Sequence, residues 1–162
     1  MDEFRYDLKI PLERVAVLIG KQGEIKKQLE EGSGCKLIVD SKEGDISVIG
    51  SDALQLYSLR EVIRAVGRGF NPDIAEQLLK QDYLLEIIPL KDIARHKNDM
   101  IRLKGRVIGA DGKSRRTIEM LTECSISVYG KTVGIIGSAE NMPPRKASHR
   151  ATAKREYARF CL

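Results

Sequence analysis

The stretch GKQGEIKKQLEEGSGCKLIV, residues 20–39, recurs 89 residues later as GADGKSRRTIEMLTECSISV, residues 109–128. The two copies align without a gap, and each opens with a Gly-x-x-Gly motif. Five of the twenty aligned pairs are identical: Gly20/Gly109, Gly23/Gly112, Glu30/Glu119, Cys35/Cys124 and Val39/Val128. Self-similarity at a fixed spacing indicates an internal repeat. The chain of 162 residues is therefore predicted to contain two copies of one structural unit.

The residues around each copy predict the same order of elements: strand, helix, Gly-x-x-Gly turn, helix, strand, strand and helix. Alternating polar and apolar residues over 5–10 are typical of a strand, and Pro11 suits the first turn of the next helix. The other elements expected in the first unit are a helix at 24–31, strands at 35–39 and 46–49, and a helix capped by Ser51 or Asp52. In the second unit we expect strands at 83–88, 124–129 and 132–136, helical stretches up to 108, and a helix at 113–122. This pattern indicates an α+β protein.

The repeat divides the chain into four segments. They are a first unit at 1–70, a linker helix at 71–82, a second unit at 83–142 and a basic C-terminal tail at 143–162. The second unit departs from the first at its end, because Pro143-Pro144 blocks a helix that would continue through that point. The tail is open to three interpretations: a lineage-specific basic arm, a segment ordered by RNA, or an altered coding sequence.

Charge is distributed unevenly along the chain. The net charge is +5, from 28 Lys and Arg against 23 Asp and Glu. Residues 1–90 have a net charge of −4, residues 91–116 of +6, residues 117–142 of −2 and residues 143–162 of +5. A basic centre and a basic end favour a nucleic-acid partner for the second half of the chain.

Other classes of function find little support. No apolar run approaches the ~20 residues that span a bilayer, and we expect no signal peptide at the N-terminus. Three cysteines without a close pair are typical of a reducing compartment, so we expect a cytoplasmic protein. No Cys/His spacing fits a metal site, no P-loop or dinucleotide fingerprint is complete, and no nucleophile is paired with a base. We expect no enzymatic activity, cofactor, metal, membrane or small-molecule substrate.

A Gly-x-x-Gly turn between two helices is suited to holding phosphates. Glycine lets another backbone approach closely, and the amides that open the second helix attract an anion. Basic residues stand at equal offsets in both copies, and we read Asp111 as weakening the second site without abolishing it. The candidate site residues are Gly20, Lys21, Gln22, Gly23, Lys26 and Lys27 in the first copy, and Arg106, Gly109, Ala110, Asp111, Gly112, Lys113, Arg115 and Arg116 in the second.

On these motifs the chain resembles the type I KH family, as a tandem pair. The resemblance implies two βααββα domains, each with a three-stranded sheet packed against three helices. It also implies that each Gly-x-x-Gly loop clamps about four nucleotides of single-stranded RNA. The bases would lie in an apolar groove, for which the candidates are Val17, Ile19, Ile25 and Ile38, with Val107, Ile108, Ser114 and Ser127.

The stretches RVIGADGKSRRTIE and ISVYGKTVGIIG, both in the second unit, are similar to archaeal relatives of the partner-of-Nob-one pre-ribosomal proteins. That resemblance implies binding to the 3′ end of small-subunit ribosomal RNA during ribosome maturation. It also implies contact with the alpha subunit of translation initiation factor two or with the maturation endonuclease. The alternative is a protein-interaction adaptor in a pre-ribosomal or translation-initiation complex, with RNA bound only by the second unit. Because residues 1–90 are net negative, we expect the second unit to supply most of the RNA affinity.

Overall fold

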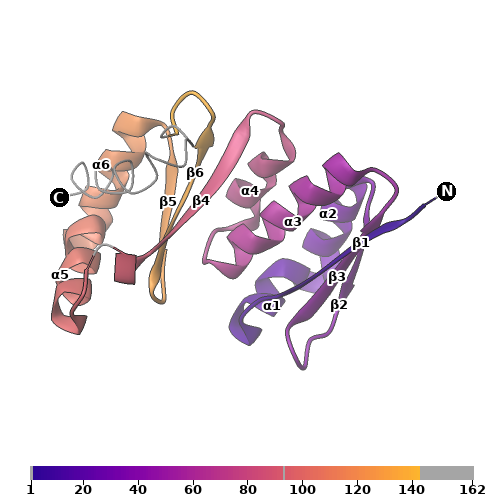
Figure 1. Ribbon diagram of the computed structural model, residues 1–162, viewed down its shortest axis with the longest axis horizontal. Coiled ribbons are helices and arrows are strands. Elements are labelled where there is room, and N and C mark those ends of the chain that lie inside the picture. Colours follow the sequence, from indigo (N-terminus) through magenta and orange to yellow (C-terminus); the bar gives the residue numbers. More distant parts are fainter. Residues whose placement is uncertain (1, 93, 143–162) are drawn as a thin grey trace. The chain divides into compact units, whose positions relative to one another are not determined.

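The computed structural model describes residues 2–92 and 94–142. The chain divides into two compact units, Met1–Tyr83 and Leu84–Leu162 (Figure 1). No helix in the described ranges combines the length and the apolar character needed to cross a membrane.

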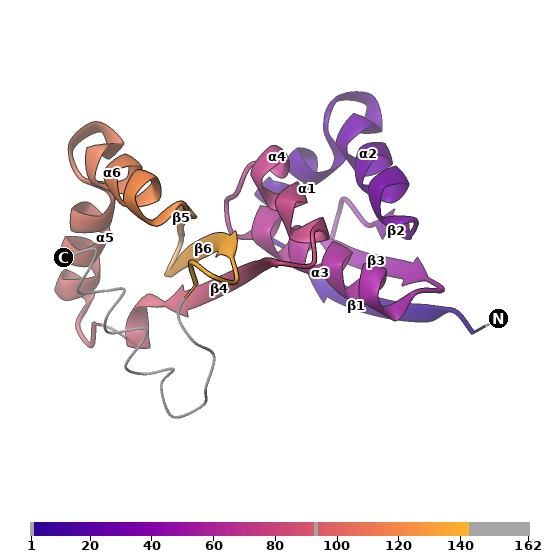
Figure 2. The ribbon, with the colours of Figure 1, turned by 90° about the horizontal axis from the view of Figure 1, so that it is seen from above.

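The first unit is a three-stranded antiparallel sheet covered on one face by helices (Figures 1 and 2). Its strands lie in the order β1-β3-β2, so β2 is an edge strand. The elements are β1 (Phe4–Lys9), α1 (Leu12–Ile19), the 3-10 turn η1 (Lys21–Gly23), α2 (Glu24–Ser33), β2 (Lys36–Val39), β3 (Asp45–Gly50) and α3 (Ala53–Gly67). This is the order predicted from the repeat.

The core of this unit follows from strand and helix periodicity. Ile46 and Val48 lie on the same face of β3 and are buried against the helices, while Ser47 between them is on the other face. On α3, Leu56, Leu59 and Ile63 recur at helical spacing and are also buried. Of the two predicted caps for this helix, the structure uses Asp52, whose side chain accepts a hydrogen bond of 2.9 Å from the Leu54 amide.

Residues 71–82, expected as a linker helix, fold as the short helix α4 (Pro72–Ala75) followed by the 3-10 turn η2 (Glu76–Leu79). Both elements pack against α3, and Ala75 and Leu78 are buried. Gln28 on α2 donates a hydrogen bond of 2.9 Å to the Glu76 carboxylate. These contacts make the segment part of the first compact unit.

The second unit repeats the architecture. Its elements are β4 (Tyr83–Pro89), the 3-10 turn η3 (Leu90–Asp92), α5 (Lys97–Ile108), the 3-10 turn η4 (Ala110–Gly112), α6 (Lys113–Thr122), β5 (Ser125–Tyr129) and β6 (Thr132–Ser138). The strand order is β4-β6-β5, which makes β5 the counterpart of β2. The α+β class and the two three-stranded sheets are thus confirmed. The predicted C-terminal tail, and any third helix of this unit, lie outside the described residues.

The repeated cysteines are core residues. Cys35 and Cys124 are buried, and burial raises the pKa of the Cys35 thiol. A Cβ added to Gly50 would lie 2.7 Å from the Cys35 sulfur, and one added to Gly137 would lie 2.5 Å from the Cys124 sulfur. The repeated glycines therefore make room for the repeated cysteines.

Candidate nucleic-acid interface

The two Gly-x-x-Gly loops have the same backbone conformation. The first glycines, Gly20 and Gly109, have φ/ψ of 75°/−178° and 69°/−177°, a region that glycine alone occupies readily. The second glycines, Gly23 and Gly112, have φ/ψ of 75°/16° and 72°/15°, in the left-handed helical region. Each motif thus contains glycine for two different conformational reasons.

The residue before each second glycine is also left-handed. Gln22 has a φ of 53° and Asp111 has a φ of 52°. Asp is among the residues that tolerate this conformation best, which is a backbone reason for its presence in the second loop. The loops share this shape although, of their four residues, they share only the glycines.

This backbone presents amide groups to the solvent. In each loop a residue in the right-handed region (Lys21, Ala110) precedes one in the left-handed region (Gln22, Asp111), the pairing that forms an anion-binding nest. The N–H groups of these four residues make no hydrogen bond with any described residue. Each loop leads directly into a helix with glycine at its N-cap, so no side chain covers the positive end of the helix dipole.

The charges at the start of the two helices differ. α2 begins with Glu24, whereas α6 begins with Lys113 and has no acidic residue in its first turn. Two residues after the start of each helix, the first member of each basic pair lies beside a carboxylate. Lys26 and Arg115 lie within 4.0 and 3.8 Å of the Glu30 and Glu119 carboxylates. Arg116, the second member of its pair, donates a hydrogen bond of 2.7 Å to the Asp111 carbonyl. This bond ties the second loop to α6.

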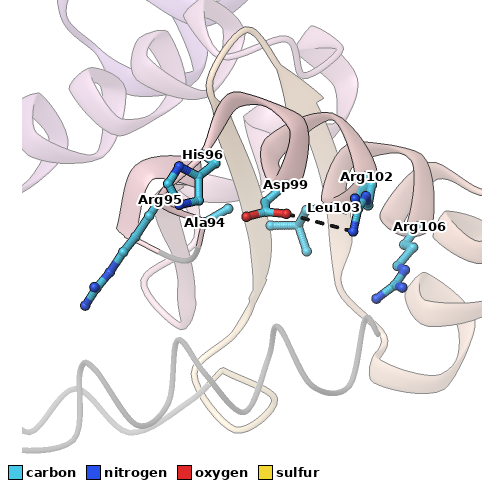
Figure 3. Close-up of a pocket in the computed structure, with 7 residues that line it drawn as sticks. All are labelled: Ala94, Arg95, His96, Asp99, Arg102, Leu103 and Arg106. Carbon is cyan, nitrogen blue, oxygen red and sulfur yellow. Dashed lines mark ion pairs between the residues drawn. The ribbon is translucent and has the colours of Figure 1, made fainter.

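Arg106 extends the positive charge of the second loop along α5. It lies three residues before Gly109, on the side of the helix that also carries Arg102 (Figure 3). With Arg95, His96 and their neighbours, these arginines line a pocket of about 440 Å³. Asp99, 4.0 Å from Arg102, is the one acidic side chain in the described lining. In the first unit the position of Arg106 is occupied by Val17.

Three of the predicted groove positions, Val107, Ile38 and Ser127, are wrong. Val107 is 3% exposed and belongs to the core, because it is the repeat equivalent of the buried Leu18. Ile38 is on the opposite face of β2 from the buried Leu37, since side chains alternate along a strand. Its repeat equivalent Ser127 is likewise on the opposite face of β5 from the buried Ile126. The residues that approach the edge strand from α2 and α6 are instead Glu30 and Glu119, whose signal in the sequence is that they are identical between the repeats. Each accepts a backbone hydrogen bond from that strand, at 2.9 Å from the Leu37 amide and 3.0 Å from the Ile126 amide.

Comparison with known proteins agrees with this geometry. A KH domain profile matches residues 5–65. Residues 84–151 match a profile of the second KH domain of PNO1 proteins, which is a eukaryotic-type KH domain (type I). The chain belongs to the KH family. A KH domain-containing protein of Methanocaldococcus jannaschii is 47% identical over 160 residues, which cover 91% of this chain and 70% of the relative.

Solved structures extend the likeness to nearly the full length of the chain. Dim2p from Pyrococcus horikoshii is 36% identical with a TM-score of 0.83, covering 98% of this chain and 90% of its own. The a/eIF2alpha-aDim2p-rRNA complex from the same organism matches with a TM-score of 0.84 and 36% identity, covering 98% of this chain and 85% of that one. A protein of unknown function from Aeropyrum pernix matches with a TM-score of 0.81 and 30% identity, over 99% of this chain and 92% of its own. The chain is therefore a tandem type I KH protein whose second KH domain is PNO1-like.

Proposed function

We propose that both KH units bind single-stranded RNA by holding its phosphates on the Gly-x-x-Gly loops. The observation that carries this proposal is the pair of unbonded, consecutive amides in each loop, at the uncapped start of a helix. The residues assigned to RNA are Gly20, Lys21, Gln22, Gly23, Lys26 and Lys27 in the first unit, and Arg106, Gly109, Ala110, Asp111, Gly112, Lys113, Arg115 and Arg116 in the second. The protein acts by binding, without catalysis.

The second unit is proposed to contribute most of the affinity. Lys113 stands beside its loop where Glu24 stands in the first unit, and Arg106 stands where the first unit has Val17. Both replacements make the potential around the second loop more positive. Phosphates are held mainly by such charge, so the first loop provides the same backbone site with less electrostatic attraction.

The proposed target is the 3′ end of small-subunit ribosomal RNA during ribosome maturation, in the cytoplasm. Support comes from the solved complex of the Pyrococcus relative, which contains both an rRNA and a/eIF2alpha. We therefore also propose the initiation factor two alpha subunit as a partner. The maturation endonuclease is a further proposed partner, for which the family resemblance is the only argument.

Crosslinking and sequencing of RNA bound in cells tests the target. Enrichment of reads at the 3′ end of small-subunit rRNA is the expected result. Reads scattered over messenger RNA would contradict the specific target and leave a general RNA-binding protein.

Binding is expected to weaken steeply with salt. For single strands, log K falls by about 0.7 per phosphate neutralised for each tenfold rise in salt. With about four nucleotides on one loop, affinity for a short oligomer should fall roughly 50-fold between about 50 and 200 mM salt. Fluorescence anisotropy titrations at several salt concentrations measure this slope, and a flat dependence would contradict phosphate binding by the loops.

An adaptor role for the first unit is the second candidate. Its β1 edge carries Phe4 and Tyr6, and α3 carries Tyr57, all of them more than 40% exposed. The Arg60 guanidinium lies 4.9 Å from the Tyr6 ring centroid and 5.8 Å from that of Tyr57. Aromatic and arginine side chains are enriched in protein interfaces, so this surface favours a protein partner for the acidic unit.

A further inference from the structure

The second unit has a basic pocket along α5, separate from its Gly-x-x-Gly loop. This α5 pocket is lined by residues 94–96 and by Asp99, Arg102, Leu103 and Arg106, and its volume is about 440 Å³. Figure 3 shows Arg102 and Arg106 on one side of α5, with Arg95 and His96 before its first turn. Asp99 is the single acidic residue against three arginines in the described lining.

Much of this lining comes from added length in the second unit. Seven residues, 90–96, separate β4 from α5, whereas two residues separate β1 from α1. α5 is also longer, with 12 residues against eight in α1. At the repeat offset of 89, α1 begins at the position of Ile101, so residues 94–96 and Asp99 belong to the added length. The first unit therefore has the same loop without these pocket residues.

The arginines give the α5 pocket a positive charge. Arg102 stands at the position of Glu13 in the first unit, and its side chain is 73% exposed. Its nearest carboxylate, that of Asp99, is 4.0 Å away. Arg95 and Arg106 are exposed and make no ion pair with any residue in the described ranges. Three guanidinium groups thus face the solvent beside one carboxylate, an arrangement that attracts anions.

The α5 pocket lies on the side of the helix away from the predicted groove. Arg106 and the groove candidate Ile108 are two residues apart, so their side chains point in directions about 200° apart around the helix. Along the axis, Arg106 is about 4.5 Å before Gly109, and Arg102 is about 6 Å further from the loop. A strand that crosses the second loop can therefore leave the groove and continue onto these arginines.

We propose that the α5 pocket is a second phosphate-binding site, which holds the RNA strand beyond the nucleotides clamped by the second loop. This inference rests on the proposed binding of RNA by the loops. Guanidinium groups match the geometry of phosphate oxygens and can bind two of them at once. Arg106 connects the pocket to the loop, which favours the same RNA strand over an acidic segment of a protein partner. The second unit thus binds a longer stretch of RNA than the about four nucleotides of its loop.

Removing the two arginines that are farther from the loop tests the assignment in the full-length chain. Arg95→Gln/Arg102→Gln leaves the loop and Arg106 intact. Anisotropy titrations compare oligo(C) of about four nucleotides, which fills one loop, with oligo(C) of about ten, which extends past it. The variant should bind the longer oligomer roughly tenfold more weakly at low salt, the scale of one charge-assisted hydrogen bond. Its affinity for the shorter oligomer should stay within about twofold of wild type, since screening limits the effect of distant charges.

The salt dependence gives a second readout. Each phosphate contact contributes about 0.7 to the slope of log K against log salt for a single strand. Loss of two contacts should therefore reduce the slope for the longer oligomer by about 1.4 and leave that for the shorter one unchanged.

Arg5→Gln/Lys9→Gln is the charge-matched control. Both residues are on β1, at the opposite edge of the first sheet from β2, and their side chains are 60% and 63% exposed. This variant has the same change in net charge and should bind both oligomers with nearly wild-type affinity. A loss equal to that of the pocket variant would mean that only net charge matters, and would overturn the assignment.

The outcomes separate this inference from the proposed function. If the wild-type protein binds neither oligomer, both the RNA-binding function and the assignment of the α5 pocket fail. If it binds both but the pocket variant weakens them by the same factor, the pocket does not extend the RNA site and the assignment fails alone. Unchanged binding of both oligomers also overturns the assignment and is the result expected of a pocket for an acidic protein segment. Thermal unfolding of the pocket variant close to wild type ensures that weaker binding does not reflect loss of the fold.

Discussion

The double variant Ala110→Asp/Lys113→Asp is expected to lose at least tenfold in affinity for a single-stranded oligomer. Each hydrogen bond to a charged group contributes roughly 1.5–3 kcal/mol, so the loss of one such bond is enough for this effect. Asp at position 110 places a carboxylate on the unbonded amides of the loop, and loss of Lys113 removes the cation that opens α6. Neither Ala110 nor Lys113 has a positive φ, so the substitutions add no backbone strain. Anisotropy titration with one labelled RNA at fixed salt measures the change.

The first loop provides a matched control. Lys21→Asp/Gln22→Asp changes the net charge by the same −3, and Asp already occupies the left-handed position in the second loop. If the second unit supplies most of the affinity, the first-loop variant should retain most of the binding. Equal losses in the two variants would show that both units contribute alike, and no loss in either would exclude the loops from RNA binding.

The repetition of sequence made most of the fold predictable. Gly20 and Gly109 could be aligned without a structure, and the surrounding periodicity then predicted the strands and helices in the correct order. Which side of a helix or strand each residue faces was harder to predict. Val107 was assigned to the groove although the fixed offset pairs it with the buried Leu18, and it is Arg106 that takes the place of Val17. A shift of one residue on a helix turns a side chain by about 100°, which is enough to exchange core for surface.

The charged part of the site was harder to predict. Sequence offsets indicated that Lys26 and Arg115 face phosphates, and their spacing to Glu30 and Glu119 was a signal for these ion pairs that the sequence analysis did not use. The Glu30 and Glu119 carboxylates reach those cations because residues four apart share one side of a helix. Their hydrogen bonds to Leu37 and Ile126 depend on how helix and edge strand pack, which only the folded chain reveals.

The two glycines of each motif are expected to differ sharply in their tolerance of alanine. Gly109→Ala should lower the free energy of unfolding of the second unit by about 3 kcal/mol, since a residue held in a glycine-only region costs roughly 1–3 kcal/mol and overpacking costs a similar amount. The added Cβ would lie 2.5 Å from Ser114 Oγ and 2.9 Å from the Ser114 backbone nitrogen. The hydroxyl can rotate away, but the backbone nitrogen cannot move without displacing the first turn of α6.

Gly112→Ala is the matched comparison in the same unit. A Cβ on Gly112 would have no atom within 4 Å, so this variant carries only the cost of a left-handed alanine, about 1 kcal/mol. Chemical denaturation of the two variants of the full chain compares the same transition. The first unit repeats the test, because a Cβ on Gly20 would meet the Ile25 side chain and lie 3.0 Å from the Ile25 nitrogen, whereas one on Gly23 meets nothing within 4 Å. An equal loss of unfolding free energy in both alanine variants would mean that the positive φ alone accounts for the motif. A larger loss at Gly109 and Gly20 would mean that the close approach of the helix backbone requires the first glycine.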